Sequence, residues 1–510
     1  MLHLPKHSLY TILLSTIILA GCSAEPPKEF TEANQTAPIY PEYNSTVIPY
    51  NIAPLNFAYK AEGKQYITEL KAGDQSLVMK GKSTDWKIKD WHKLLEANKG
   101  KTIEINTYIQ NEEGWQKYRP IKWQIAEEPI DPYISYRIIA PSYVTYEELS
   151  IRQRNLTNFD EQIIYNNMLL SDAVNGQCIN CHHYRNYKTD NMQFHVRQHK
   201  GGTMLVNNGE VKKINLKTDS TISAGVYPAW HPTHNFIAYS INDTGQSFHT
   251  KNNNKIEVQD LKSDLILYDI DRNEVSFIEH DTLEWEVFPA WAPDGKTLYY
   301  NSAHYEIQDY AVREREIIDN YKEFKYNIYR KSFDPETQAF GPAELVLDAD
   351  TLGKSATLPR ISPDGRYLLF GMAEYGCFHI WHKDADLYMI DLTNMKMQNM
   401  KELNSNDVES YHSWSSNGRW ILYTSRRDDG GYTRLYIAYF DKNGKAHKPF
   451  ILPQEDPYFY DNYYKSYNVP EYMIEPVTIT PQEFARHIDT EVVPATFKSQ
   501  ARKCGEISRG

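Results

Sequence analysis

Four segments in the second half of the chain share one pattern, and this repeat constrains the fold more than any other feature. In each, an apolar stretch is followed by a tight turn and a second apolar stretch, and in three of them the turn contains Asp-Gly or Asn-Gly. Gly and Asn accept the positive φ that such turns need, and the aromatic, β-branched and leucine residues on either side are typical of strands. The segments are Tyr227–Ser240, Phe288–Tyr300, Leu358–Phe370 and Tyr411–Tyr423.

A third strand-like stretch follows each segment, at 264–269, 327–330, 386–391 and 434–439. A lone sheet of this kind would leave both apolar faces in water, whereas radial stacking of several sheets buries them. We therefore predict a mainly β protein with a β-propeller over residues 206–480. Four blades are clear, and stretches near Gly202–Leu216 and after Phe450 would bring the total to six. Four aligned copies argue against a β-sandwich with coincidental turns.

The repeated pattern resembles the TolB-like, WD40-like (PD40) blades of periplasmic propeller proteins. The resemblance covers roughly residues 207–480, just over half of the chain. It implies a propeller that acts in the cell envelope and offers a docking surface to a partner.

The first residues are typical of an export signal and are not expected to be part of the folded domains. Residues 1–22 combine Lys6, a short apolar core and Leu-Ala-Gly before Cys22, which is similar to a bacterial lipobox in which the cysteine is acylated. An ordinary signal peptide with an incidental Cys22 is the alternative. Residues 23–49 are polar and Pro-rich, as expected of a tether. We expect a lipid-anchored protein at the outer membrane, facing the periplasm.

Three further regions flank the predicted propeller. Period-two alternation in residues 50–145 indicates antiparallel strands and a small β-sandwich. Residues 146–205 are expected to form a helical linker and a haem-binding segment, because 146–171 is rich in Glu, Gln, Leu and Arg. Thr480, Pro481 and Glu483 form a capping box that predicts a helix at the start of a C-terminal region, 481–510.

Residues 177–183 contain Cys178-Ile-Asn-Cys181-His182, the attachment pattern of c-type haem. Two thiols three positions apart on a helical turn meet the two vinyl groups of one porphyrin, and the adjacent imidazole becomes the proximal ligand of the iron. We therefore expect one covalent haem c on Cys178 and Cys181, with His182 on the metal. Export agrees with this expectation, because such haems are attached outside the cytoplasm.

The distal haem ligand is chosen from residues shortly after the motif. We favour the thioether of Met192, with His195, His199 and Met204 as runners-up. A thioether raises the haem potential and a second imidazole lowers it. Each of these side chains could equally be a plain loop residue.

The same cysteines allow two other interpretations. Cys178, Cys181, His195 and His199 have the spacing of a Cys2His2 zinc site, although the apolar residues of a nucleic-acid zinc finger are absent between them. A redox disulfide between Cys178 and Cys181 would lack its usual βαβ context. Cys377 and Cys504 are isolated in sequence and could pair in an oxidising compartment. We favour two unpaired thiols.

The order of regions resembles that of a group of Bacteroidetes lipoproteins related to TolB and to cytochromes c. Their Gln-Arg-Asn-Leu element is present here at 153–156. The resemblance spans nearly the whole mature chain but implies no defined activity.

Composition and motifs narrow the function. A net charge of −12 argues against nucleic-acid binding, and the sequence has neither Gly-x-Ser-x-Gly nor His-Glu-x-x-His. The chain is therefore predicted to be a haem c lipoprotein for electron transfer or redox sensing with a periplasmic redox or envelope protein as partner, rather than an enzyme. The alternatives are a non-redox binding propeller with structural zinc, and a haem-assisted propeller enzyme. His379 and His382 are expected in the core or in the central channel.

Overall fold

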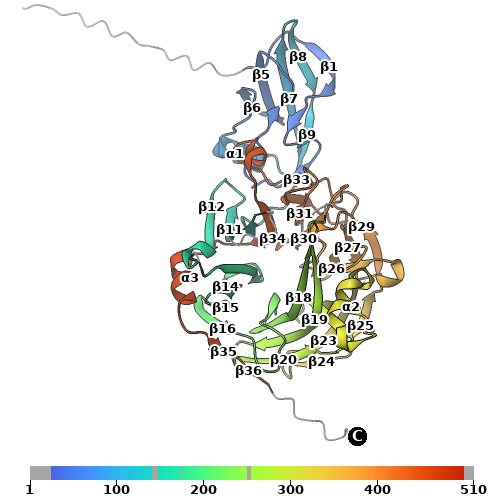
Figure 1. Ribbon diagram of the computed structural model, residues 1–510. Helices are drawn as coiled ribbons and strands as arrows, with labels where there is room; N and C mark the ends of the chain where they lie inside the picture. Colours follow the sequence, from blue (N-terminus) through green and yellow to red (C-terminus); the bar gives the residue numbers. More distant parts are fainter. Residues whose placement is uncertain (1–24, 141–147, 173, 250–253, 499–510) are drawn as a thin grey trace, which may run out of the picture.

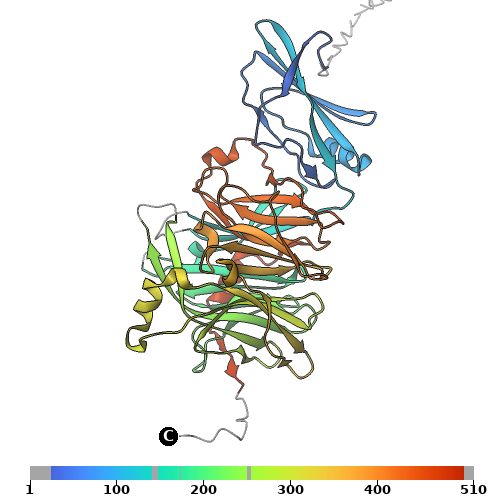
Figure 2. The ribbon, with the colours of Figure 1, turned by 90° about the vertical axis from the view of Figure 1, so that its right-hand side faces the viewer.

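The computed structural model describes residues 25–140, 148–172, 174–249 and 254–498. It consists of a smaller N-terminal domain and a ring of sheets (Figure 1). The N-terminal domain stands at one rim of the ring in both views (Figures 1 and 2). Cys22 and Cys504 lie outside the described residues. Within the described ranges, no helix is long and apolar enough to cross a membrane.

The N-terminal domain is built on one seven-stranded sheet in the order β1-β8-β7-β5-β6, with β9 beside β7 and β3 beside β9. Alternation is clear in β9, where Ile121, Trp123 and Ile125 are buried and the residues between them are exposed. Strands β2 and β4 of the same region form a separate two-stranded sheet. The strands are β1 (Thr31–Thr36), β2 (Ile39–Tyr40), β3 (Val47–Ile48), β4 (Ala58–Tyr59), β5 (Gln65–Ala72), β6 (Gln75–Lys80), β7 (Thr102–Asn111), β8 (Gly114–Arg119) and β9 (Ile121–Ile125).

The second layer of this domain differs from the β-sandwich predicted for residues 50–145. The apolar face of the sheet packs on helix α1 (Ile88–Ala97), which buries Trp91, Leu94 and Leu95, and on apolar residues of the 43–57 segment. A helix and a loop are sufficient to bury this face, so the alternating strands need no second sheet.

Six sheets form the propeller, which confirms the predicted mainly β class and the predicted number of blades. Blade 1 is β34-β10-β11-β12, and the last strand of the ring, β34, pairs antiparallel with β10 from the other end of the propeller sequence. This pairing closes the ring and removes the sheet edges that an open array would expose. The strands of blade 1 are β10 (Tyr133–Ile139), β11 (Ser150–Asn155), β12 (Glu161–Asn166) and β34 (Ser466–Met473).

Blades 2 to 6 follow one another along the chain. The predicted turns are present, with Gly295, Gly365 and Gly418 at φ of 66°, 72° and 66°. Blade 2 is β13 (Gln177–Arg185), β14 (Lys188–Gln198), β15 (Gly202–Asn207) and β16 (Glu210–Asn215); blade 3 is β17 (Val226–Trp230), β18 (Phe236–Phe248), β19 (Ile256–Asp269) and β20 (Glu274–Glu279); blade 4 is β21 (Glu284–Trp291), β22 (Thr297–His304), β23 (Asn327–Asp334), β24 (Ala339–Phe340) and β25 (Glu344–Leu347); blade 5 is β26 (Ser355–Ile361), β27 (Tyr367–Ala373), β28 (Asp386–Asp391) and β29 (Lys396–Asn399); blade 6 is β30 (Glu409–Trp414), β31 (Trp420–Ser425), β32 (Arg434–Tyr439) and β33 (Phe450–Ile451).

The helix predicted over residues 146–171 is wrong. Residues 150–166 form strands β11 and β12 of blade 1, followed by the short 3₁₀ helix Asn167–Leu169. The propeller therefore begins near residue 133 rather than at 206. Pairing of β11 between β10 and β12 overrides the helical propensity of its Arg and Gln residues.

The C-terminal segment crosses the outer edges of two blades. Helix α3 (Pro481–Ile488) begins as predicted, because the Thr480 side chain accepts a hydrogen bond from the Glu483 backbone N–H. Two short strands then extend blades 2 and 3: β35 (Val493–Pro494) pairs with β16, and β36 (Thr496–Phe497) pairs with β20. A second short helix, α2 (Arg313–Asp319), lies in the connection between β22 and β23.

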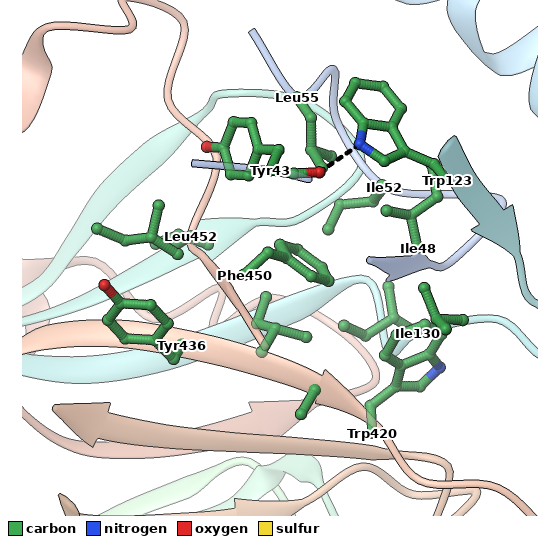
Figure 3. Packing of buried hydrophobic residues seen from close by; sticks show 14 of the residues in the cluster. Tyr43, Ile48, Ile52, Leu55, Trp123, Ile130, Trp420, Tyr436, Phe450 and Leu452 are labelled. Carbon is green, nitrogen blue, oxygen red and sulfur yellow. Dashed lines mark hydrogen bonds between the residues drawn. The ribbon is translucent and has the colours of Figure 1, made fainter. Parts of the chain in front are cut away.

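One apolar core joins the N-terminal domain to blade 6 (Figure 3). Trp420 of β31 is fully buried there and its indole N–H donates to the carbonyl of Pro129 at 2.9 Å. Asp131 accepts from the backbone N–H and the hydroxyl of Ser416 at 2.6 and 2.5 Å. The domain is therefore held against the propeller by both apolar packing and buried hydrogen bonds.

Candidate functional site

The innermost strands of the six blades, β13, β17, β21, β26, β30 and β34, contact one another in succession around the hub. Each has an irregularity in its pairing with the next strand at a corresponding place. In four blades the irregularity is an X-Pro pair, and proline suits it because proline has no N–H to give to the ladder. These pairs are Tyr227-Pro228, Phe288-Pro289, Leu358-Pro359 and Val469-Pro470.

Side chains at these irregularities form a narrow constriction on the propeller axis. Every blade contributes at least one lining residue, and the free volume is ≈ 30 Å³, room for a few waters at most. Among six of these residues, one from each blade, five have a positive φ, between 47° and 55°. This conformation is strained for bulky residues, and residues that adopt it are often found at functional sites. The six residues, called the hub ring below, are Cys181, Tyr227, Phe288, Leu358, Tyr411 and Val469.

The Cys-x-x-Cys-His motif is part of this repeat. Cys178, Cys181 and His182 lie on β13, the inner strand of blade 2, and not on a helical turn. Cys181-His182 occupies the place of the X-Pro pairs. In blade 6 the residues without a ladder partner are Ser410 and Tyr411, and His412 pairs with Tyr423. The sequence carried a signal for this, because Cys-His-His-Tyr at 181–184 parallels Tyr-His-Ser-Trp at 411–414.

His182 has little space around its ring in this fold. Its side chain is fully buried, neither ring nitrogen has a hydrogen-bond partner, and Nε2 is 3.9 Å from Oε2 of Glu471. Burial lowers its imidazole pKa to about 4, against the opposing effect of Glu471. A porphyrin with its iron on His182 would have to occupy the ≈ 30 Å³ constriction. With His182 as proximal ligand, the residues as folded do not fit a haem.

The four predicted distal ligands lie in different surroundings. Met192 and Met204 are completely buried in the apolar core shared by blades 1 and 2, so neither faces the axial channel. His195 lines the channel, and its Nδ1 is 3.0 Å from the hydroxyl of Thr203. His199 is in the β14–β15 turn, where its backbone N–H donates to Gly176.

The described residues include both cysteines and both histidines of the predicted zinc set. No group of three or more His, Cys, Asp or Glu side chains there is arranged to hold a metal. Cys178, Cys181 and Cys377 are free thiols.

Above the hub ring the channel widens into a funnel of ≈ 490 Å³. Cys178 is partly exposed in it, whereas Cys181 is buried in the constriction below. Three arginines line the funnel: Arg137 on β10, Arg197 on β14 and Arg426 just after β31. The lining residues, all of them described, include no Asp or Glu, although the whole chain has a net charge of −12.

Arg426 is the most unusual of these arginines. It is 3% exposed, its Cζ lies 3.1 Å from the centroid of the Trp381 ring, and its Nε and Nη1 have no hydrogen-bond partner. Burial lowers its pKa to about 9, although Asp407 and Asp429 act in the opposite direction. Arg137 donates through Nη1 to the carbonyl of Ile179, and its Nε has no partner.

On the other side of the hub ring lies a second cavity of ≈ 330 Å³. Trp230, Trp291 and Trp414 line it from three blades, three positions after a hub-ring residue in each case. Two of these indoles bind the preceding blade, Trp291 to Ala229 O and Trp414 to Arg360 O. This repeated contact indicates that the tryptophans hold the blades together at this end of the hub.

His379 and His382 lie beside the hub rather than in it. His382 Nε2 is 3.0 Å from Oε1 of Glu257, and both side chains are buried. Nearby, the Cys377 thiol donates to Asp260 at 3.3 Å. Burial raises the Asp260 pKa to about 6. This polar cluster fixes the loop after β27 against β19, and the histidines belong to that packing.

Comparison with known proteins finds only distant structural similarity. No family model matches the chain, and no curated protein matches it. Similar solved structures include the β-propeller domain of the Trilobed protease from Pyrococcus furiosus, with 10% identity over 83% of this chain and 99% of that one and a TM-score of 0.35. The tricorn protease has 12% identity over 69% of this chain and a TM-score of 0.32, and this chain spans 34% of its length. The apocarotenoid oxygenase of Synechocystis has 11% identity, covers 84% and 98%, and scores 0.36.

Proposed function

We propose that the protein is a binding module of the bacterial cell envelope whose ligand enters the axial funnel of the propeller. The observation that carries this proposal is the funnel itself, ≈ 490 Å³ in volume, lined by three arginines and no carboxylate. Cavities of this size with a few convergent polar groups are the usual form of ligand sites. The hub ring closes the inner end, so a ligand enters and leaves by the open side.

The thiol of Cys178 allows a direct test of the funnel. N-Ethylmaleimide on Cys178 would place a bulky group inside it, and Cys22→Ser and Cys504→Ser remove the two cysteines outside the described region. We expect thermal-shift measurements with short peptides, organic acids and oligosaccharides to find a stabilising class, and expect the modification to abolish that shift. Cys178→Ser treated in the same way is the control and should still respond. Absence of any stabilising class, or a shift unaffected by the modification, would refute the proposal.

Covalent haem c on Cys178 and Cys181 is the second candidate. The arrangement that favours it is that both thiols border the axial channel, Cys178 in the funnel and Cys181 in the constriction. His195 also lines the funnel, and a hydrogen bond on its Nδ1 is the support that metal-bound histidines usually have. Haem would supply electron transfer or redox sensing with an envelope protein partner.

A spectrum decides the haem hypothesis. The full chain should be produced together with a haem-attachment system, and its pyridine haemochrome spectrum and intact mass measured. Haem c predicts an added porphyrin mass that is lost in Cys178→Ala/Cys181→Ala. A colourless protein with unmodified thiols would exclude it, since a control cytochrome in the same cells shows that attachment works.

We also propose that acylation of Cys22 anchors the chain to the envelope. The short apolar core before Leu-Ala-Gly-Cys and the resemblance to TolB-like lipoproteins support this. Metabolic labelling with a palmitate analogue should mark the wild-type chain and not Cys22→Ala. Equal labelling of the two chains would refute the anchor.

A further inference from the structure

The funnel has two chemically different walls. Its basic wall comes from blades 6, 1 and 2, which are neighbours where the ring closes, and it contributes Arg426, Arg137 and Arg197. Blade 3 and the loop after β27 contribute a row of apolar side chains, including Ile256, Val258 and Phe378, beside neutral polar side chains such as Asn242 and Thr244. A ligand that satisfies both walls needs an anionic end and an apolar body.

The basic wall contains donors that the folded chain leaves without partners. Arg426 is 3% exposed and has two unpartnered nitrogen atoms, and Arg137 has one. Asp407 and Asp429 raise the Arg426 pKa but form no direct ion pair with it. A buried guanidinium without a direct partner is costly, because the loss of hydration is only partly replaced. Its planar fork matches a carboxylate in a bidentate arrangement. The stacking of Arg426 on Trp381 fixes the orientation of this fork.

We propose that the funnel binds the carboxylate of an organic acid with an apolar body, the carboxylate against Arg426 and Arg137 and the body against the apolar wall. This inference rests on the proposed binding function and names the ligand class of the same site. The carboxylate can come from the C-terminus of an apolar peptide or from a free apolar acid. The Oδ1 atom of Asn242, which is buried in the wall without a partner, is placed to accept a hydrogen bond from a peptide N–H.

The test compares a free acid with its amide. The probes are the peptide Ala-Ala-Leu-Phe with an N-terminal fluorophore, as the free acid and as the C-terminal amide, and decanoate, whose binding is measured directly by calorimetry. We expect the free acid to bind at least roughly 10-fold more tightly than the amide, since a charged hydrogen bond exceeds a neutral one by about this amount. Binding of the peptide acid points to a protein C-terminus as the source, and binding of decanoate alone points to a free acid.

Two variants locate the carboxylate. Arg426→Met should weaken binding of the acid by roughly 10- to 100-fold, and Arg137→Gln should weaken it as well. Arg315→Met, which removes an exposed arginine of helix α2, is the matched control and should bind as the wild type does. Thermal unfolding of Arg426→Met should be unchanged or higher, because the substitution removes an unpaired buried charge.

The inference fails if the peptide acid and the peptide amide bind with the same measurable affinity, or if neither the peptide acid nor decanoate binds. It also fails if Arg426→Met binds the acid as tightly as the wild type does. The comparison of acid with amide uses the wild-type chain, so it remains decisive if a variant does not fold. These outcomes are separate from those of the thiol modification. If modification of Cys178 displaces a neutral ligand, the proposed binding function is supported, and only the proposed carboxylate class of ligand is refuted.

Discussion

A single buried carboxyl group gives a sharp prediction about stability. Glu286 on β21 is 1% exposed and neither of its carboxyl oxygens has a hydrogen-bond partner. Burial, together with the nearby Asp264, Glu279 and Glu284, raises its pKa from 4.5 to about 9. In the folded protein at pH 7 the group is therefore protonated, whereas in the unfolded chain it is ionised.

The sign of the pH effect follows from proton binding. Between pH 4.5 and 9 the native state binds one proton more than the unfolded state at this site, so stability falls as the pH rises. The slope is about 1.4 kcal/mol per pH unit, or roughly 3 kcal/mol lost by pH 7. Glu286→Gln has nearly the same shape and no proton to bind, so it should remove this loss.

Urea denaturation at pH 5.5, 7.0 and 8.5 tests this reasoning. We expect the variant to be more stable than the wild type by about 1.4 kcal/mol at pH 5.5, and the difference to grow by about 1.4 kcal/mol with each further pH unit. Glu112→Gln, at a side chain that is 84% exposed, is the control and should show no such slope. A difference between Glu286→Gln and wild type that does not change with pH would show that Glu286 is ionised in the folded protein.

Three further predictions address packing, capping and thiol chemistry. Trp420→Ala should lower the free energy of unfolding by roughly 3–5 kcal/mol in urea denaturation, because Trp420 is fully buried between the domains and its indole N–H donates to Pro129 O. The same variant should make the 125–133 segment more sensitive to limited proteolysis. Trp420→Phe should lose less stability. Thr480→Ala should cost about 1 kcal/mol in local stability, seen as faster hydrogen exchange in 481–488, and Thr480→Ser should restore it. In peptide mapping at pH 7.5, maleimide should modify Cys178 well before Cys377, since Cys377 is 3% exposed and burial, together with Asp260, raises its thiol pKa.

The blades could be predicted because their information is local. Asp-Gly and Asn-Gly fix the turns at Gly295, Gly365 and Gly418, and apolar residues on both sides fix the strands they join. Blade 1 could not be predicted, because the information that specifies it is not local in the sequence. Its strands β10 to β12 have their inner neighbour β34 more than 300 residues away in the chain, and without that neighbour 146–171 reads as a helix. The C-terminal strands β35 and β36 are too short to leave a pattern.

The funnel could not be predicted from the sequence. Arg137, Arg197 and Arg426 come from three blades and from no common motif, and each alone is an ordinary strand or loop residue. They converge only because blade 6 meets blade 1 where the ring closes. Sequence reasoning did single out Cys178, which lies in the same funnel, but for its spacing to Cys181 and His182 rather than for its surroundings.

The Cys-x-x-Cys-His motif therefore has two parts with different origins in strand β13. The blade repeat alone requires a residue in the left-handed region at 181, facing the axis, as in five of the six blades. The next residue has no ladder partner, and it is Pro in four blades and His182 in blade 2. The repeat makes no such demand at 178, where the side chain only has to face the funnel. The backbone conformation at 181 and 182 thus follows from the propeller, whereas the thiol of Cys178 does not. Of the two thiols, only that of Cys178 is partly exposed, so a ligand in the arginine-lined funnel meets the motif at Cys178.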